Sequence, residues 1–219
     1  MELTHDRLCR EASEFSFLES THPEPSLYGI TDGKAVGTYL EAKFLGFLRF
    51  RGYVFQQGNA AKGLDFPSLG VDIKVTSVKQ PQSSCPFRSI RQKVYGLGYG
   101  LVVFIYSKSD NHISKTATLT IMNAIYISAN QTADFMMTQG IRETLSKGAN
   151  IEEVAAFMQS RSLTDDYDDL MLLAQDIMAN PPAQGYLTIS PALQWRLQYG
   201  RAIGYADQVP GVVSVYRSL

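Results

Sequence analysis

Three charged side chains lie within ten positions of a segment that otherwise has the pattern of a buried β-hairpin. The segment is 62–79, KGLDFPSLGVDIKVTSVK, and the three residues are Asp65, Asp72 and Lys74. Charged groups in such a segment need either solvent or a partner, because burying an unpaired charge is costly. The pattern therefore indicates either the polar face of an exposed hairpin or a catalytic cluster.

The register of the hairpin decides whether these side chains meet. Side chains alternate along a strand, so Asp72 and Lys74 share one face. If PSLG is a four-residue turn, Phe66 pairs with Val71 and Asp65 lies opposite Asp72. Two carboxylates at that spacing repel each other unless a cation lies between them. Mg²⁺ suits such a position, since it typically binds one or two carboxylates and retains water.

Lys74 and Glu41 extend this pattern towards phosphodiester hydrolysis. The ammonium of Lys74 could hold an attacking water or a phosphate oxygen beside a metal ion. Glu41, on the preceding predicted helix, could supply a third carboxylate. These groups together would suit in-line attack on a phosphodiester. The acid-x-Lys tripeptide alone is not diagnostic, because the chain contains it at 32–34, 41–43 and 72–74.

The elements that must position these residues follow from hydrophobic periodicity and turn signals. Residues 31–51 predict a helix that Thr31 or Asp32 caps and Gly52 ends. Capping patterns predict further helices after residue 130. We expect strands at 53–57, 101–106, 116–128 and 185–189, helices at 88–98, 151–159, 165–178 and 192–199, and a turn at 107–112.

This order of elements predicts an α/β (mixed α+β) fold. The expected architecture is a mixed β-sheet flanked by helices, with a largely helical C-terminal lobe. We expect one domain over 1–219, with a catalytic core at 30–130 and the helical lobe at 131–219. No apolar run approaches a membrane span and the charged start lacks an apolar signal core, so we expect a cytoplasmic protein without a membrane partner.

The charge distribution is uneven although the net charge is only −1. Residues 62–115 contain eight bases and three acids, whereas residues 150–185 contain seven acids and one base. A positive field over one face would attract phosphate groups. Arg88 and Arg91 on the predicted helix at 88–98 suit phosphate contacts, and a solvated helix face is the alternative.

The order of helix glutamate, hairpin aspartate and Asp-x-Lys strand resembles the PD-(D/E)XK nuclease superfamily, which includes many type II restriction endonucleases. The segments GKAVGTYLE, ending in Glu41, and DFPSLGVDIK, from Asp65 to Lys74, are most similar to MutH-like endonucleases. The spacing of seven residues between the two hairpin acids is the same. Leu64 stands where the superfamily usually has proline, and Asp72 where the MutH-like proteins have glutamate. The resemblance covers roughly residues 33–106.

This resemblance implies a restriction-endonuclease-like core and Mg²⁺-dependent hydrolysis of double-stranded DNA to leave a 5′-phosphate. Asp65, Asp72 and Glu41 would hold Mg²⁺, and Lys74 would position the nucleophilic water. The lobe at 131–219 would recognise the DNA sequence. The residues expected to bind DNA are Lys34 and Lys93, as equivalents of lysines near the site, together with Arg88 and Arg91.

The expected function is that of a type II restriction endonuclease acting at a specific short sequence. A homodimer would match a palindromic site, because a two-fold protein matches a two-fold sequence. Two alternatives remain open at this point. One is a monomeric MutH-like repair or nicking endonuclease, and the other is a non-catalytic DNA-binding protein whose hairpin face is only a polar surface.

Overall fold

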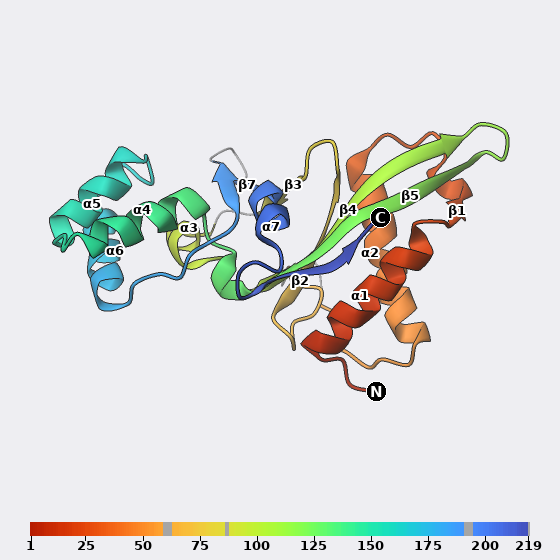
Figure 1. The fold of residues 1–219 in the computed structure, drawn as a ribbon, viewed down its shortest axis with the longest axis horizontal. Helices are drawn as coiled ribbons and strands as arrows, with labels where there is room; N and C mark the ends of the chain where they lie inside the picture. Colours follow the sequence, from red (N-terminus) through yellow and green to blue (C-terminus); the bar gives the residue numbers. More distant parts are fainter. Residues whose placement is uncertain (59–62, 86–87, 191–194, 219) are drawn as a thin grey trace. The chain divides into compact units, whose positions relative to one another are not determined.

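The computed structural model describes residues 1–58, 63–85, 88–190 and 195–218, and the chain divides into two compact units (Figure 1). The first unit comprises Met1–Ser83, Gly100–Ser128 and Ala202–Leu219. The second comprises Ser84–Tyr99 and Ala129–Arg201. The predicted lobe at 131–219 therefore contributes to both units. The mixed α+β class agrees with the prediction.

A mixed five-stranded sheet forms the centre of the first unit. Its path is β1-β5-β4-β2, and β8 also pairs with β5. Strands β2 and β4 are parallel, whereas the other pairs are antiparallel. Strand β2, which carries the predicted catalytic pair, thus lies at one end of this path. The strands are β1 Pro23–Glu24, β2 Val71–Ser77, β4 Gly100–Asn111, β5 Thr116–Ile127 and β8 Val212–Arg217.

Two long helices, α1 (His5–Glu19) and α2 (Gly33–Phe50), pack with β2, β4 and β5 in one hydrophobic core (Figure 1). The rings of Phe15, Phe44 and Phe104 join the two helices to β4, with centroids 5.1–5.7 Å apart. A short 3-10 helix, η1 (Pro25–Leu27), lies between them in the chain. This aromatic cluster fixes α2 against the sheet.

Helix α2 begins and ends as predicted. The carboxylate of Asp32 accepts hydrogen bonds from the backbone amides of Lys34 and Ala35 at 3.1 and 3.2 Å, which satisfies two otherwise unpaired donors of the first turn. A β-carbon added at Gly37 would lie 3.8 Å from Val75 Cβ, so the helix lies directly on β2. The first turns of α2 are thereby fixed next to β2.

Two predictions in the first unit are wrong. The predicted turn at 107–112 is part of β4, because pairing with β5 continues to Asn111 opposite Thr116. The ion pair between Lys108 and Asp110 lies on this extension. In the predicted strand at 53–57, the structure shows only one isolated bridge. It joins Val54 to Glu2, near the N-terminus.

The second unit is largely helical. Its helices α4, α5 and α6 bury a shared hydrophobic core with Val94 of α3. Helix α5 begins with the predicted capping box, in which Asn150 and Glu153 each bond the other's backbone. The helical elements are α3 Arg91–Tyr95, η2 Ala129–Gln131, α4 Phe135–Ser146, α5 Ile151–Ser160 and α6 Tyr167–Ala179, and α7 Gly200–Tyr205 crosses into the first unit.

A three-stranded sheet of order β3-β7-β6 corrects another prediction. Its strands are β3 Gln82–Cys85, β6 Thr188–Ser190 and β7 Trp195–Gln198. The predicted helix at 192–199 is wrong in its described part, which is β7, antiparallel to β6; residues 191–194 lie outside the described residues. Trp195 and Leu197 are buried while Arg196 is exposed, which is the alternation of a strand. The helix predicted at 88–98 is likewise shorter and spans only α3.

Candidate active site

The turn before β2 has the predicted register. Phe66 and Val71 exchange two backbone hydrogen bonds, of 3.0 and 3.2 Å, and form an antiparallel bridge. Gly70 closes the turn with a φ of +60°, which glycine adopts without steric cost. Residues before Phe66 do not continue as a strand, so the hairpin has only one long arm. This geometry places Asp65 beside the start of β2.

Asp65 is fixed against β2 by the backbone. Its Oδ2 accepts a hydrogen bond of 2.7 Å from the amide of Ile73. The carboxyl groups of Asp65 and Asp72 lie within hydrogen-bonding reach of each other, and so do those of Asp65 and Glu41. Glu41 comes from the middle of α2. Three carboxyl groups from a helix, a turn and a strand therefore meet around Asp65.

Lys74 completes the group. Its Nζ lies 2.6 Å from Asp72 Oδ2, as expected for two side chains on one face of a strand. The side chain of Asp72 is only 6% exposed and that of Lys74 is 23% exposed. The ammonium thus offsets the charge of a nearly buried carboxylate.

One cavity of about 390 Å³ contains all of these side chains. It is lined by Glu41, Asp65, Asp72 and Lys74 and by one further polar side chain, Gln57. Backbone and apolar groups of the adjoining loop and strand complete its wall, namely Gly58, Gly63, Leu64 and Ile73.

Burial and crowding change the proton affinity of the two aspartates. The pKa of Asp72 is raised to about 7, chiefly by burial and also by the neighbouring Asp65, while Lys74 opposes the change. Burial also raises the pKa of Asp65, and the hydrogen bonds from Asp72 and Ile73 oppose this rise. Asp72 is therefore the member of the pair whose pKa is raised close to neutrality.

The carboxylates and the lysine do not form a finished metal cage. Among the residues that the structure describes, no three His, Cys, Asp or Glu side chains form a ready metal-binding group. The oxygen of Asp72 that faces Lys74 is already in an ion pair. Binding of a cation at this position would require Asp72 to turn from Lys74 towards the ion.

Comparison with known proteins identifies the family. The family model "Type II restriction enzyme NspV" matches residues 2–214. The type II restriction enzyme NspV of Nostoc sp. (strain ATCC 29411 / PCC 7524) is 56% identical over 216 residues, which cover 99% of this chain and 98% of that protein. The chain belongs to the NspV family of type II restriction enzymes. No solved structure matches it.

Membership of the NspV family confirms the predicted class of enzyme. The protein is a type II site-specific deoxyribonuclease, and DNA is its substrate. A repair nicking enzyme and a non-catalytic DNA-binding protein do not fit this family. No helix within the described ranges is long and apolar enough to cross a membrane.

The predicted DNA-binding residues of this NspV-family enzyme are distributed over both units. Lys34 is exposed in the first turn of α2, in the first unit. Arg88, Arg91 and Lys93 belong to the second unit. Arg91 already forms an ion pair with Asp176 and stacks on the ring of Tyr95 at 5.1 Å. The structure thus gathers the four predicted catalytic residues in one cavity, whereas the four predicted DNA-binding cations belong to two different units.

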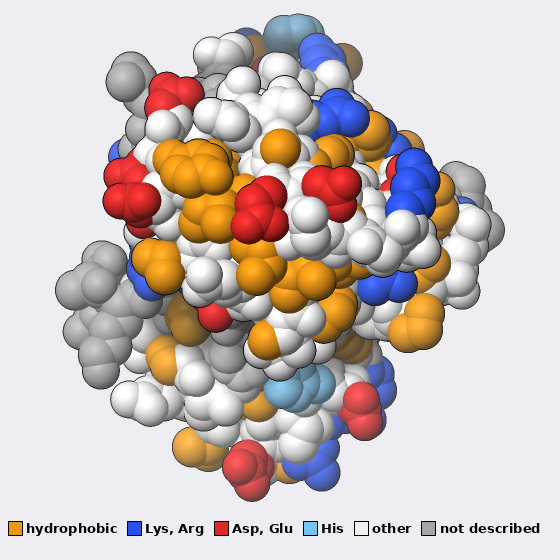
Figure 2. All heavy atoms as spheres, turned by 90° about the vertical axis from the view of Figure 1, so that its left-hand side faces the viewer, with side chains coloured by type: hydrophobic (Ala, Val, Ile, Leu, Met, Phe, Trp, Pro, Cys, Tyr) orange, Lys and Arg blue, Asp and Glu red, His pale blue; other side chains and the backbone are white. Residues whose placement is uncertain are grey.

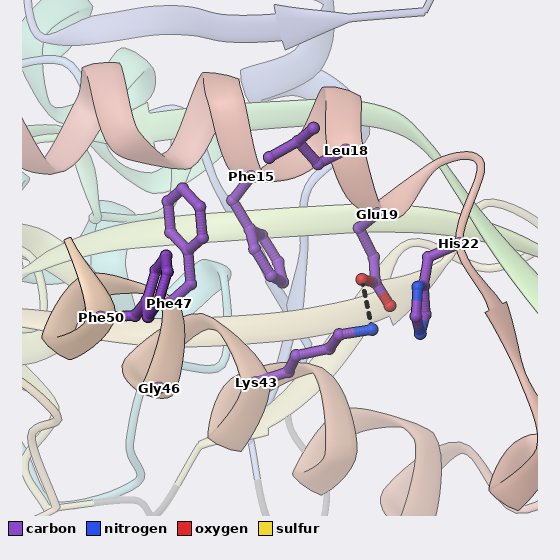
Figure 3. A pocket seen from close by; sticks show the side chains of 8 residues that line it. All are labelled: Phe15, Leu18, Glu19, His22, Lys43, Gly46, Phe47 and Phe50. Carbon is purple, nitrogen blue, oxygen red and sulfur yellow. Dashed lines mark ion pairs between the residues drawn. The ribbon is translucent and has the colours of Figure 1, made fainter.

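Acidic side chains lie at the starts of two helices of the second unit. The first turns of α5 and α6 carry Glu152, Glu153, Asp168 and Asp169. Figure 2 shows acidic side chains scattered among hydrophobic ones on the side of the molecule that it faces. Helix dipoles favour acids at these positions, so the acids need no metal to explain them. Asp169 lines one cavity together with Arg88 and Arg91, so these acids lie beside two of the predicted DNA-binding residues.

Gln57 is the lining residue that the sequence did not reveal. Its Oε1 accepts a hydrogen bond from Arg49, whose guanidinium also lies 5.6 Å from the Phe55 ring centroid. Because a guanidinium only donates, this bond turns the amide oxygen to Arg49 and leaves the NH₂ group as a donor. No sequence pattern indicates that Gln57 belongs to the site. Only the fold places its side chain beside the carboxylates.

Proposed function

We propose that the cavity around Asp65 is the active site at which this enzyme hydrolyses phosphodiesters of double-stranded DNA at a specific short sequence, with Mg²⁺ as cofactor. Glu41, Asp65 and Asp72 would hold the ion and Lys74 would position the nucleophilic water, in the manner of the PD-(D/E)XK superfamily. One observation carries the proposal: three carboxyl groups and a lysine from separate elements line a single cavity.

The donor set suits Mg²⁺. All three acidic groups offer oxygen atoms, which are the ligands that this hard cation prefers. The pKa of Asp72 is raised because burial disfavours its charged form and the positive charge of Lys74 does not fully compensate. Mg²⁺, when bound, supplies that charge, lowers the pKa of a water and offsets the charge of a phosphate.

The side chains of the site then have distinct tasks. Asp65 is the most rigid of them, because the amide of Ile73 orients its carboxylate. Asp72, which pairs with Lys74, would also be a ligand of the ion. The ammonium of Lys74 would hold a water or a phosphate oxygen. Glu41 enters from α2 and completes the acidic side of the cavity.

The rest of the proposal concerns DNA binding and assembly. Lys34, Arg88, Arg91 and Lys93 would contact the DNA backbone, and the lobe at 131–219 would read the sequence. We propose a cytoplasmic homodimer, since two copies related by a two-fold axis match the two strands of a palindromic site. Family membership and the basic segment at 62–115 support these assignments.

Digestion of a sequenced plasmid, followed by mapping of the ends, tests the proposal. Wild-type enzyme should cut both strands at one sequence with Mg²⁺ and not with excess EDTA. Asp65→Asn and Lys74→Ala should lose at least two orders of magnitude in single-turnover rate. Asp165→Asn, which removes an exposed carboxylate outside the cavity, is the matched control. Full cleavage by Asp65→Asn or Lys74→Ala would exclude this site.

A further inference from the structure

A second cavity lies along the same edge strand as the proposed active site. It measures about 510 Å³ and lies between the start of α2, the end of β2 and the outer part of β4. Ser77 and Lys79 line it from β2 and the following turn, whereas Asp72 and Lys74 line the first cavity from the start of β2. One strand therefore links two polar cavities.

Two lysines and one aspartate line the second cavity. Lys79 is exposed, and no partner for its ammonium occurs among the described residues. Lys108 lines the cavity from β4. Lys34 follows the lining residue Gly33 on α2, and Lys115 lies near Tyr28, with its Nζ 3.3 Å from the phenol oxygen.

The two acids of this region are already engaged. Asp110 pairs with Lys108 and accepts a hydrogen bond of 3.2 Å from the amide of Gly29. These partners lower the pKa of Asp110, with Lys108 the largest cause, so it stays ionised and bound to them. Asp32 caps α2 through two backbone amides. The charge left for a ligand is therefore positive and is centred on Lys79.

Hydroxyl groups beside Lys79 complete an anion-binding surface. Ser77 Oγ accepts a hydrogen bond of 3.3 Å from the amide of Lys79, so its own hydrogen remains free to donate elsewhere. Ser107 and Thr31 also line the cavity. An ammonium with adjacent hydroxyl donors is the usual composition of a contact to a DNA phosphate.

The spacing along β2 fits a DNA backbone. Asp72 and Ser77 are five strand positions apart, which is about 16 Å at roughly 3.3 Å per residue. One DNA strand carries a phosphate every ~3.4 Å along the helix axis, so 16 Å corresponds to at most about five nucleotides. By strand alternation Ser77 points to the face of β2 opposite to Asp72, so a DNA molecule that contacts both cavities would cross the edge of the sheet at β2.

We propose that the cavity around Lys79 binds a backbone phosphate of the DNA substrate, up to about five nucleotides from the phosphate that is cut. Lys79 contributes the charge, and Ser77 and Ser107 contribute hydrogen bonds. The ion pair between Lys108 and Asp110 holds the wall of the cavity in place. The position of the cut phosphate rests on the proposed function, whereas phosphate binding by Lys79 does not.

Salt-dependent DNA binding in EDTA tests the inference without cleavage. A fluorescent non-cognate duplex is titrated with enzyme at several salt concentrations between 50 and 200 mM. One phosphate contact contributes a slope of about −0.9 in log K against log salt, so a fourfold rise in salt costs one contact about 3.5-fold in affinity. The slope of Lys79→Ala should be shallower by about 1 than that of wild type.

Three variants make the result decisive. Lys79→Arg keeps the charge and should retain the wild-type slope. Lys147→Ala removes an exposed lysine of the second unit and should also retain it. Of the three variants, only Lys79→Ala should have a shallower slope.

An unchanged slope in Lys79→Ala, or an equal change in Lys147→Ala, would overturn the inference. A methylphosphonate scan of the cognate duplex then locates the contact. Neutralising one phosphate should weaken wild-type binding but leave Lys79→Ala unaffected, and the absence of any such position would also overturn the inference. Loss of activity in Asp65→Asn is scored separately, so the two proposals fail independently.

Discussion

Replacing Asp72 by asparagine should stabilise the metal-free protein at alkaline pH. In the folded protein Asp72 has a pKa of about 7, whereas an exposed aspartate has a value near 4. Between these values the folded state holds a proton that the unfolded state has released. The free energy of unfolding of wild type therefore falls as the pH rises from about 4 to about 7 and stays low above it. The asparagine of the variant does not titrate, so its free energy of unfolding lacks this dependence on pH.

The raised pKa sets the size of the effect. Three pKa units at about 1.4 kcal/mol each give an upper limit of about 4 kcal/mol. Between pH 5 and pH 8, the free energy of unfolding of wild type should fall by roughly 2–3 kcal/mol relative to that of Asp72→Asn. For a chain of this length that corresponds to about 5–10 °C in Tm. The side chain of Asp72 is 6% exposed, so solvent does little to screen the effect.

Thermal unfolding in EDTA at pH 5 and pH 8 measures this difference. The advantage of Asp72→Asn over wild type should grow with pH, whereas Asp165→Asn should track wild type at both values. Comparing two pH values removes any constant effect of the substitution on packing. The raised pKa of the buried Asp72 is contradicted if the advantage does not grow. It is also contradicted if wild type gains stability relative to the variant at pH 8. The same variant should lose cleavage, since a neutral amide is a poor substitute for a carboxylate ligand.

Three further predictions follow from single side chains. A β-carbon at Gly58 would lie 1.7 Å from the carbonyl oxygen of Leu64, so Gly58→Ala should distort the wall of the cavity and lower the cleavage rate without changing the helical content. Hydrogen bonds from Ser26 and Tyr39 lower the pKa of Glu24 to about 2. Glu24→Gln should therefore destabilise the protein at pH 7. In acid unfolding, the difference in stability between wild type and variant should vanish as the pH falls from about 4.5 to 2. Asn150→Ala removes a capping box and should cost about 1 kcal/mol in urea unfolding, with no change in cleavage rate.

Local patterns predicted the centre of the fold and of the candidate site. The cap at Asp32 and the helical spacing after it gave α2, and the four-residue turn gave the pairing of Phe66 with Val71. Both features depend on neighbours in sequence. They sufficed to bring Asp65, Asp72 and Lys74 together, because the alternation of a strand and the length of a turn fix their positions.

The errors occurred where partners distant in sequence decide the structure. Residues 107–111 have turn-forming side chains, but eleven residues of β5 pair with β4 and extend it as a strand. Ser190 followed by proline suggested a helix, yet pairing with β6 makes 195–198 a strand. The placement of Gln57 and Lys79 in their cavities also depends on the packing of α2 against β2, which no local pattern records.

Iron-directed cleavage of the protein tests the proposed metal site most directly. Fe²⁺ replaces Mg²⁺ in the metal-free enzyme, ascorbate and peroxide generate radicals at the bound ion, and mass spectrometry maps the broken backbone positions. The account predicts breaks within a few residues of Asp65 and Asp72 that Mg²⁺ suppresses and that Asp65→Asn abolishes. Breaks confined to the acidic start of α6 at 165–169, unchanged in Asp65→Asn, would contradict it.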